Sequence, residues 1–403
     1  MRIGKTFGRA SDPDLTTGSA SGAILRLAWP MLIGSILQNV QSLIDLFWVG
    51  RLGPQAIASV AMGGTAIMVI FPLWMGLSTG TVAIVSRAIG AGRPRDAAHA
   101  AGQSLLLSVI LGAFSGLVGM GIAEPFLKLL GAAPEIVKSG GDYLAILLYG
   151  STTSYLLFTG NSALQGAGDT VTPMRTMLTA NLINLILDPL LIFGIGPLPS
   201  LGVQGAALAT VIAQFLACSI SLRKLHHPDT PYRIRLSDWR PNGALCRRIL
   251  RIGLPGTGQM LSRSLMNAVM MSLVAGFGTI AVAAYGTGMR FHMILLMPAF
   301  ALANAAATMV GQNLGAGKPE RAAHAAWIAT GLYAALVFLS SAIVFIWASE
   351  LIGLFSEDAA VIAVGCAYLR MVSPFYIFAA PGIILGRALN GAGDTLMPMI
   401  ITV

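Results

Sequence analysis

Long apolar runs separated by short polar segments fill almost the whole chain. Each run is close to the roughly 20 residues that an α-helix needs to cross the hydrocarbon core of a bilayer. Alternating segments of about ten residues, typical of transmembrane β-strands, are absent from the sequence, so the pattern predicts helices as the spanning elements. We expect ten full spans, near 24–48, 56–84, 99–122, 142–162, 174–196, 203–222, 252–275, 280–309, 324–348 and 361–385. An eleventh run begins near Leu396.

The composition agrees with a membrane protein. Of 403 residues, 55% are hydrophobic and 10% are charged, and the mean hydropathy is +0.76. A soluble domain carries about 25% charged residues, so lipid must cover most of this exterior. The net charge of +9 would suggest a nucleic-acid partner in a soluble protein. Here the basic residues lie between apolar runs, so membrane topology explains them and we expect no nucleic-acid partner.

Lysine and arginine are concentrated on one side of the predicted membrane. With the N-terminus in the cytoplasm, 19 of them fall in inside segments and three in outside segments. This bias predicts a cytoplasmic N-terminus. Residues 1–23 contain no apolar core of a cleavable signal peptide, so the first span is expected to direct insertion. The predicted regions are an N-terminal segment, a first lobe, a basic cytoplasmic linker and a second lobe, at 1–23, 24–222, 223–250 and 251–403.

When the sequence is compared with itself at one constant shift in residue number, it matches without any gap. This shift is here named the repeat offset. Segment 90–94 (GAGRP) matches 315–319 (GAGKP), and 166–170 (GAGDT) is identical to 391–395. Apolar composition alone does not place polar loop motifs in register, so we infer an internal repeat. Six spans per repeat leave both halves in the same orientation. The predicted fold is an all-α polytopic membrane protein with two six-helix lobes, related by a pseudo-two-fold axis along the membrane normal.

The repeat also predicts what should follow the eleventh run. The counterparts of spans 174–196 and 203–222 would extend beyond Val403. We therefore expect the second lobe of this sequence to lack about two helices at its C-terminus.

Two acids, Asp45 and Asp188, lie within predicted spans of the first lobe. A charge at the centre of a span costs about 2.5–3.5 kcal/mol on insertion scales, so such residues usually serve function. Each acid ends a polar stripe with spacing i, i+3, i+7; the stripes are Gln38, Gln41, Asp45 and Asn181, Asn184, Asp188. A carboxyl removed from water holds a proton more readily, and a second carboxyl nearby adds to this. The stripes predict a proton or cation site; alternatively, both acids meet water near the outer ends of their spans.

The second lobe has no acid within a predicted span, but it has two central arginines. Arg263 lies one turn from Asn267, and Arg290 is in the next span. Eight of the 19 methionines lie between Met260 and Met309, and methionine-rich surfaces suit promiscuous binding. The predicted cavity residues are Gln38, Met260, Arg263, Asn267, Arg290 and Met293. Alternatively, the arginines pair with helix carbonyls and the methionines are core or lipid-facing filler.

Pro30 and Pro255 occupy matching positions in the first span of each lobe. A proline inside a helix removes a hydrogen bond and permits a kink, so Pro30 is a candidate hinge. The alternative is a proline in the first helical turn. Enzymatic motifs fail on context: segment 76–80 (GLSTG) resembles a nucleophile elbow but lies in a span, and no phosphate-binding loop or metal-ligand spacing is present in the sequence. We therefore expect no enzyme, metal or cofactor.

Several motifs together resemble the multidrug and toxic compound extrusion (MATE) family. They are Arg51-Leu52-Gly53 after Asp45, the two Gly-Ala-Gly-Arg/Lys-Pro loops, the segments 165–169 and 390–394, and Asn184-x-x-x-Asp188-Pro189. The likeness covers residues 20–403. It implies a twelve-helix, cation-coupled antiporter that exports amphipathic, often cationic compounds from a bacterial-type inner membrane.

The sequence is most similar to the DinF-type branch of that family. Asp45, Asn184 and Asp188 match the first-lobe site of this branch for protons or sodium, and Pro30 matches its kink residue. Thr210 is a weaker candidate for the same site. The second-lobe acids of the NorM-type branch are absent from this sequence, which argues against a second-lobe cation site.

The predicted function is therefore multidrug antiport, in exchange for H⁺ or Na⁺, by rocking of two lobes about a central cavity. The expected partners are drug-like small molecules and the lipid bilayer, and we expect a monomer. A flippase for a lipid-linked sugar or cell-wall precursor is the alternative, but it would need several cationic cavity residues. An intramembrane enzyme or signalling protein would need a nucleophile with a base, or a soluble domain, and the sequence shows neither.

Overall fold

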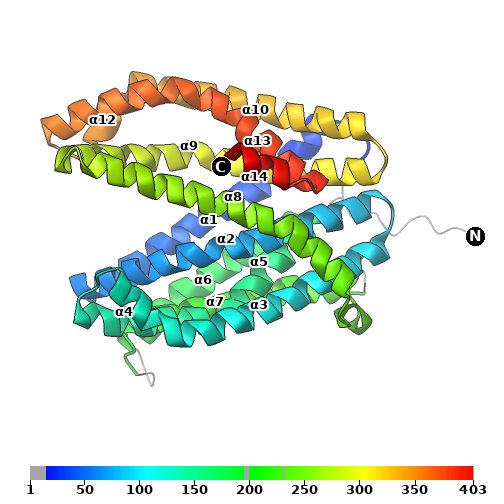
Figure 1. Cartoon of the computed structure of the whole chain (residues 1–403), viewed down its shortest axis with the longest axis horizontal. Helices are drawn as coiled ribbons and strands as arrows, with labels where there is room; N and C mark the ends of the chain where they lie inside the picture. The colour runs from blue at the N-terminus through cyan, green and yellow to red at the C-terminus, as the bar shows by residue number, and fades with distance from the viewer. Residues whose placement is uncertain (1–14, 195–198, 229, 231, 403) are drawn as a thin grey trace, which may run out of the picture.

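The computed structural model describes residues 15–194, 199–228, 230 and 232–402. The predicted N-terminal segment up to residue 14 and the end of the predicted span 174–196 lie outside these residues. All regular elements of the described chain are helical, as predicted, and Figure 1 shows their order. They are α1 (Ala20–Gly50), α2 (Pro54–Gly90), α3 (Pro94–Leu129), α4 (Pro134–Tyr149), α5 (Ser151–Gly166), α6 (Val171–Phe193), α7 (Val203–His226), η1 (Leu236–Trp239), α8 (Gly243–Ala275), α9 (Thr279–Gly315), α10 (Pro319–Ile346), α11 (Ala348–Gly353), α12 (Ala359–Val372), η2 (Ser373–Phe375), α13 (Tyr376–Ala392) and α14 (Leu396–Thr402).

Eight helical stretches of the described chain are long and apolar enough to cross a membrane, where the sequence predicted ten full spans. They are Ala20–Gly50, Pro54–Gly90, Pro94–Gly119, Val171–Phe193, Val203–His226, Thr279–Gly315, Pro319–Ile346 and Ala359–Ala392. The predicted span 142–162 is divided at Gly150 into α4 and α5. The predicted span 252–275 lies in α8, which is helical but carries several polar residues along its length. Both differences arise where polarity or a break interrupts an apolar run.

Proline and glycine mark the helix ends. Proline is the first residue of α2, α3, α4 and α10, where its missing N–H costs no helical hydrogen bond. The loops between helices contain glycines with positive φ, which residues with a Cβ rarely adopt. These angles recur at the repeat offset: φ is 68° at Gly92 and 71° at Gly317, and 98° at Gly168 and 91° at Gly393. Helices α2 and α9 likewise begin and end at matching positions of the repeat.

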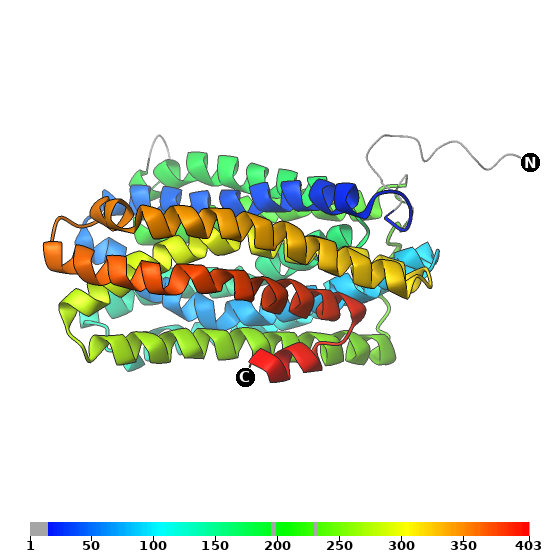
Figure 2. The ribbon, with the colours of Figure 1, turned by 90° about the horizontal axis from the view of Figure 1, so that it is seen from above.

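The helices form two groups that run along the long axis of the molecule. The first half is α1–α7 and the second half is α8–α14. The two groups approach each other at the end where α2 and α9 finish, here named the converging end, and separate towards the opposite end (Figure 1). The last residues of these helices are Gly90 and Gly315. Figure 2, turned by 90°, shows the short α14 beside α8, with which it packs.

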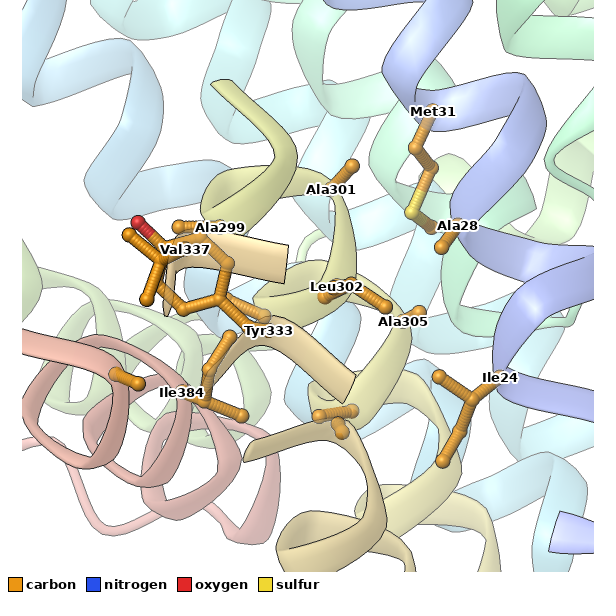
Figure 3. Close-up of a cluster of buried hydrophobic side chains, with 14 of the residues drawn as sticks. Ile24, Ala28, Met31, Ala299, Ala301, Leu302, Ala305, Tyr333, Val337 and Ile384 are labelled. Carbon is orange, nitrogen blue, oxygen red and sulfur yellow. The ribbon is translucent and has the colours of Figure 1, made fainter. Parts of the chain in front are cut away.

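The first helix of each half crosses to the other half. Figure 3 shows Ile24, Ala28 and Met31 of α1 packed towards Leu302 of α9 in the core of the second half. In the same way, Ile249 of α8 belongs to the core cluster of the first half. Close packing of this kind stabilises helix association in lipid, where burial from water is no longer available as a driving force. Each half is therefore anchored to the start of its partner's first helix.

The halves touch most closely through glycines at the converging end. A Cβ at Gly90 would overlap the backbone of Gln312, and a Cβ at Gly315 would overlap the carbonyl of Arg87. Residues 87 and 312 are matching positions of the repeat, as are 90 and 315. Reciprocal contacts of this type are what a two-fold relation produces at an interface. Glycine is needed at both positions because the two backbones leave no space for a side chain.

Much of the predicted linker 223–250 is helical among the described residues. Its two ends belong to α7 and α8, so the non-helical connection is shorter than the hydrophilic stretch suggested. The short helix η1 is fixed to the first half: Arg95 forms an ion pair with Asp238 at 2.8 Å. The Gln103 amide donates a hydrogen bond of 2.7 Å to the Asp238 carbonyl. The connection is thus docked on α3 rather than free between the halves.

Candidate functional site

The two acids predicted from the sequence meet between α1 and α6, which pack along each other. Asp45 comes from α1 and Asp188 from α6, and their carboxyl groups lie close enough to influence each other's charge. Asp188 and Asn184 are fully buried at 0% exposure. The Asn184 amide nitrogen donates to Asp188 Oδ1 at 3.1 Å, because residues four apart lie on the same helix face. The structure therefore brings Asp45, Asn184 and Asp188 into one site.

This site contains no compensating cation among the described residues. None of the ion pairs among the described residues involves Asp45 or Asp188. The atoms Asp45 Oδ1 and Asp188 Oδ2 have no hydrogen-bond partner there. Two adjacent carboxylates in a dry interior repel each other and are costly to bury. A bound proton or a monovalent cation would remove this cost, so the arrangement suits reversible uptake of one of them.

Tyr143 of α4 completes the surroundings of the acid pair. It is 8% exposed, and it lies close enough to Asp45 and Asp188 to interact with their charges. Its ring packs where Gly63 has no side chain, since a Cβ there would lie 2.7 Å from Tyr143 Cδ1. The polar stripes did not predict this residue as part of the site. Its only signal in the sequence was the match with Tyr368 in the repeat.

Asn181 connects α6 to α1 beside the acids. Its amide nitrogen donates to the Leu37 carbonyl of α1 and to the Met177 carbonyl of α6, each at 3.0 Å. Gln41 is half-buried on α1. The Thr210 hydroxyl donates to the Ala206 carbonyl of its own helix at 3.0 Å, and no described contact joins it to the acids. Asn181 is therefore placed as a structural link, while Gln41 and Thr210 have no described bond to the acid pair.

A cavity of about 400 Å³ lies between the halves. Four of the six predicted cavity residues line it, namely Gln38, Met260, Arg263 and Met293, and Pro30 lies in its wall. Asn267 and Arg290 are not among the lining residues. The Arg290 guanidinium instead lies 5.4 Å from the centroid of the Phe355 ring. The other lining side chains come from α1, α2, α5, α6, α8, α9 and α13, so both halves build the cavity.

Arg387 also lines the cavity, and its predicted location was wrong. The hydropathy pattern placed it in a cytoplasmic loop after a span ending at 385. Helix α13 instead continues to Ala392, which carries Arg387 into the space between the halves. Its Nε donates to Asn304 Oδ1 and its Nη1 donates to Thr79 Oγ1, each at 3.0 Å. No match in the repeat signalled this role, because the matching residue of the first half is Ser162.

Long apolar helices in two halves, a cavity between them and a buried acid pair define a multi-pass membrane transporter. Comparison with known families identifies which kind. The family model MatE matches residues 30–190 and 255–403, and the chain belongs to this family. The predicted resemblance is thereby confirmed, and members of the family are transporters rather than enzymes. Assignment to the DinF-type branch remains a prediction.

Relatives of known name cover nearly the whole chain. The FAD transporter of Shewanella oneidensis is 33% identical over 94% of this chain and 84% of its own length. The probable multidrug resistance protein NorM of Thermotoga maritima is 28% identical over 94% of this chain and 82% of its own length. The relatives thus include proteins named for drugs and one named for a flavin dinucleotide.

Solved structures agree closely with this fold. An outward-facing conformation of a multidrug resistance MATE family transporter has a TM-score of 0.89 and 28% identity, covering 98% of this chain and 87% of that one. A transporter of the MOP superfamily from Pyrococcus furiosus, described as having a binding pocket of reversed polarity, has a TM-score of 0.89 and 29% identity over 98% and 87%. The all-α polytopic fold predicted from the sequence is therefore confirmed.

Proposed function

We propose that this protein is a secondary active antiporter that exports small amphipathic compounds in exchange for H⁺ or Na⁺. The observation that carries this proposal is the pair formed by the half-buried Asp45 and the buried Asp188, which has no cationic partner among the described residues. A site of this kind alternates between a charged, empty state and a neutralised, loaded state. The coupling ion is a substrate, and the acid pair is its binding site.

Helix α1 connects the ion site mechanically to the cavity. Its beginning is held in the core of the second half through Ile24 and Met31. Its later part is held by α6, through Leu37 and Asp45. Pro30 lies between these two parts and lacks the N–H that would hold the helix straight. Loading of the acids therefore favours a movement of the later part of α1 about Pro30. The wall of the cavity includes this part of α1, so the movement changes the cavity.

Coupling follows if the two substrates prefer different arrangements of α1. An ion that binds one arrangement better shifts the population towards it, and the affinity for the exported compound changes by the same factor. The cavity then has to take up its cargo when the acids are empty and release it when they are loaded. Rocking of the halves, with the converging end closed in one state and open in the other, would expose the cavity to each side in turn.

The cavity favours small molecules over a lipid-linked sugar precursor. Its volume of about 400 Å³ is within the range of sites for small ligands, about 300–1000 Å³. Relatives named for multidrug resistance and for FAD are both consistent with an amphipathic cargo. The bias of basic residues supports a cytoplasmic N-terminus, which would put the converging end at the cytoplasmic side.

Transport by vesicles with one imposed gradient at a time tests the proposal. Purified full chain is reconstituted, and efflux of a fluorescent compound is followed under a pH gradient or an Na⁺ gradient. We expect one gradient to drive efflux, and we expect Asp188→Asn to reduce it to the level of empty vesicles. Asp358→Asn is the matched control, because Asp358 is an exposed N-cap of α12 and asparagine caps equally well. Wild-type efflux by Asp188→Asn would disprove the proposed role of the pair.

A further inference from the structure

We propose that the cavity between the halves is a binding site for an organic anion. Its cargo would be a small amphipathic molecule with a phosphate or carboxylate group and a flat apolar part. The inference rests on the proposed transport function and adds the charge of the substrate to it. Its basis is that the charged residues in the cavity wall are two arginines, Arg263 and Arg387, and that no aspartate or glutamate lines the wall among the described residues.

The positive charge of Arg387 is not compensated. Its two hydrogen-bond acceptors, Asn304 Oδ1 and Thr79 Oγ1, are neutral. It forms no ion pair within the described chain. The two bonds fix the guanidinium from opposite halves of the molecule, so the group is held in place before any ligand arrives. A preorganised cation of this kind binds an anion without first losing side-chain freedom.

Arg263 adds a second cation to the same space. It is half-buried, and it makes no hydrogen bond or ion pair with any residue that the structure describes. Its charge interacts with that of Arg387, so the two guanidinium groups repel each other. Two like charges near each other away from bulk water raise the energy of the empty cavity. An anion between them would relieve this repulsion, and guanidinium groups match phosphate and carboxylate oxygens in pairs.

The rest of the wall is suited to an apolar, flat group. Phe71, Phe158 and Phe300 line the cavity together with several methionines. Phe71 and Phe158 already contact each other edge to face, with ring centroids 6.0 Å apart. Aromatic faces and polarisable thioethers bind flat rings without demanding one orientation. The wall therefore recognises an aromatic body at one part and an anionic group at the other.

The acid pair does not neutralise these arginines. Neither Asp45 nor Asp188 is among the cavity-lining residues, and both lie at the interface of α1 and α6. The coupling ion and the anionic cargo therefore occupy separate places. A cationic compound would meet two like charges in the cavity and no carboxylate, which disfavours it. This result differs from the cationic cargo that the family resemblance implied.

Equilibrium binding with a matched pair of fluorescent ligands tests the inference. Flavin mononucleotide and riboflavin share one ring system and differ by a phosphate group. We expect the purified full chain in detergent to bind flavin mononucleotide about tenfold more tightly than riboflavin, the size of one charge-assisted hydrogen bond. Added salt should weaken the binding of flavin mononucleotide much more than that of riboflavin.

Two variants identify the groups involved. Arg263→Gln and Arg387→Gln should each weaken the binding of flavin mononucleotide about tenfold and change that of riboflavin less than about twofold. Arg387 also connects the halves, so its variant can affect folding; Arg263 makes no described hydrogen bond and gives an independent test. The matched control is Arg370→Gln, since Arg370 is exposed and donates to the Phe345 carbonyl outside the cavity. This variant should bind both ligands as the wild type does.

Equal affinity for the two flavins, or an unchanged preference in Arg263→Gln, would overturn the inference. So would tighter binding of the cationic dye ethidium than of flavin mononucleotide to the wild type. These measurements need no ion gradient, so they fail or succeed separately from the transport proposal. Selective binding of flavin mononucleotide without gradient-driven efflux would leave the anion site standing and reject antiport. Gradient-driven efflux without this selectivity would do the opposite.

Discussion

At the scale of single residues, local bonding accounts for most acids of the described chain but not for the pair in the membrane. Asp169 accepts from the backbone of Thr172 at the start of α6. Asp358 caps α12, and Asp238 pairs with Arg95. Asp45 and Asp188 instead face each other, and each has an oxygen without a described partner. Groups that are costly to bury and not needed for packing are expected to serve function.

The pair should behave as one unit in transport. Asp45→Asn and Asp188→Asn each remove one carboxylate from a site that shares its coupling ion. We expect each single variant to lose gradient-driven efflux, and the double variant to be no worse than either one, because interacting residues are not additive. A double-mutant cycle of efflux rates in vesicles measures this. Independent, additive losses would show that the two acids act at separate sites.

Residue spacing predicted the acid site well and the cavity only in part. Asp45, Asn184 and Asp188 were predictable because helical periodicity places each stripe on one face. Tyr143 was not, because it approaches from α4, whose packing the sequence does not show. Arg387 was missed because α13 continues beyond the apolar run and ends only at the left-handed Gly393. The charge of the cavity therefore emerged only from the structure.

At the scale of elements, the glycines of the converging end determine how closely α2 and α9 approach. Gly90 and Gly315 end these helices, and each touches the backbone of the other half. Small residues at helix interfaces let backbones come together in lipid. The contact is therefore a property of the two helix ends, and a single added methyl group is expected to disturb it.

Gly315→Ala should destabilise the protein, by about 1–3 kcal/mol, as overpacking usually does. A Cβ there would overlap the Arg87 carbonyl, and backbone cannot move aside as a side chain can. Gly331→Ala in α10 is the control, because nothing lies within 4 Å of a Cβ at that position. Alanine favours the helix there by up to about 1 kcal/mol. Thermal unfolding in detergent should show a lower Tm for the first variant only; equal Tm values would contradict the close contact.

Hydropathy predicted some helix boundaries and missed others. The predicted spans 56–84 and 280–309 start close to the first residues of α2 and α9, but both helices continue past the predicted ends to Gly90 and Gly315. The breaks at Gly150 and at Ser373–Phe375 were not found, because each lies in a short stretch of small, polar or proline residues between apolar residues. Hydropathy averaged over a whole span does not report so short an interruption of the helix.

At the scale of the whole molecule, hydrogen bonds to the backbone join the two halves. Gln312 donates to the Gly166 carbonyl at 2.9 Å, and Thr257 donates to the Pro72 carbonyl at 3.2 Å. Residues before α1 also bind the second half, since Lys318 Nζ donates to the Thr16 carbonyl at 2.8 Å. Rocking of the halves must rearrange part of this set. The structure thus represents the state in which the converging end is closed.

A disulfide between the halves should stop transport. A Cβ at Gly256 of α8 would lie 3.8 Å from Thr79 Cβ of α2, close to the spacing of a natural disulfide. The variant Thr79→Cys/Gly256→Cys is prepared with Cys218, Cys246 and Cys366 replaced by serine or alanine. Oxidation should reduce the efflux of this variant to background, and reduction should restore it to the level that the same variant shows before oxidation. Equal efflux in both redox states would show that transport does not need these helices to separate.

Arg387 stands between two equivalent points of the scaffold, because its acceptors Thr79 and Asn304 occupy matching positions of the repeat. An ancestral dimer of two identical half-length chains would carry every side chain twice, once on each side of its two-fold axis. Arginine there would be duplicated or absent, whereas this chain has Arg387 in one half and Ser162 in the other. Joining the halves in one gene lets natural selection place a single charge at the centre. Duplication and fusion would in this way have allowed the two halves to diverge. The acids that bind the ion then belong to the first half, and the arginine that recognises the cargo belongs to the second half.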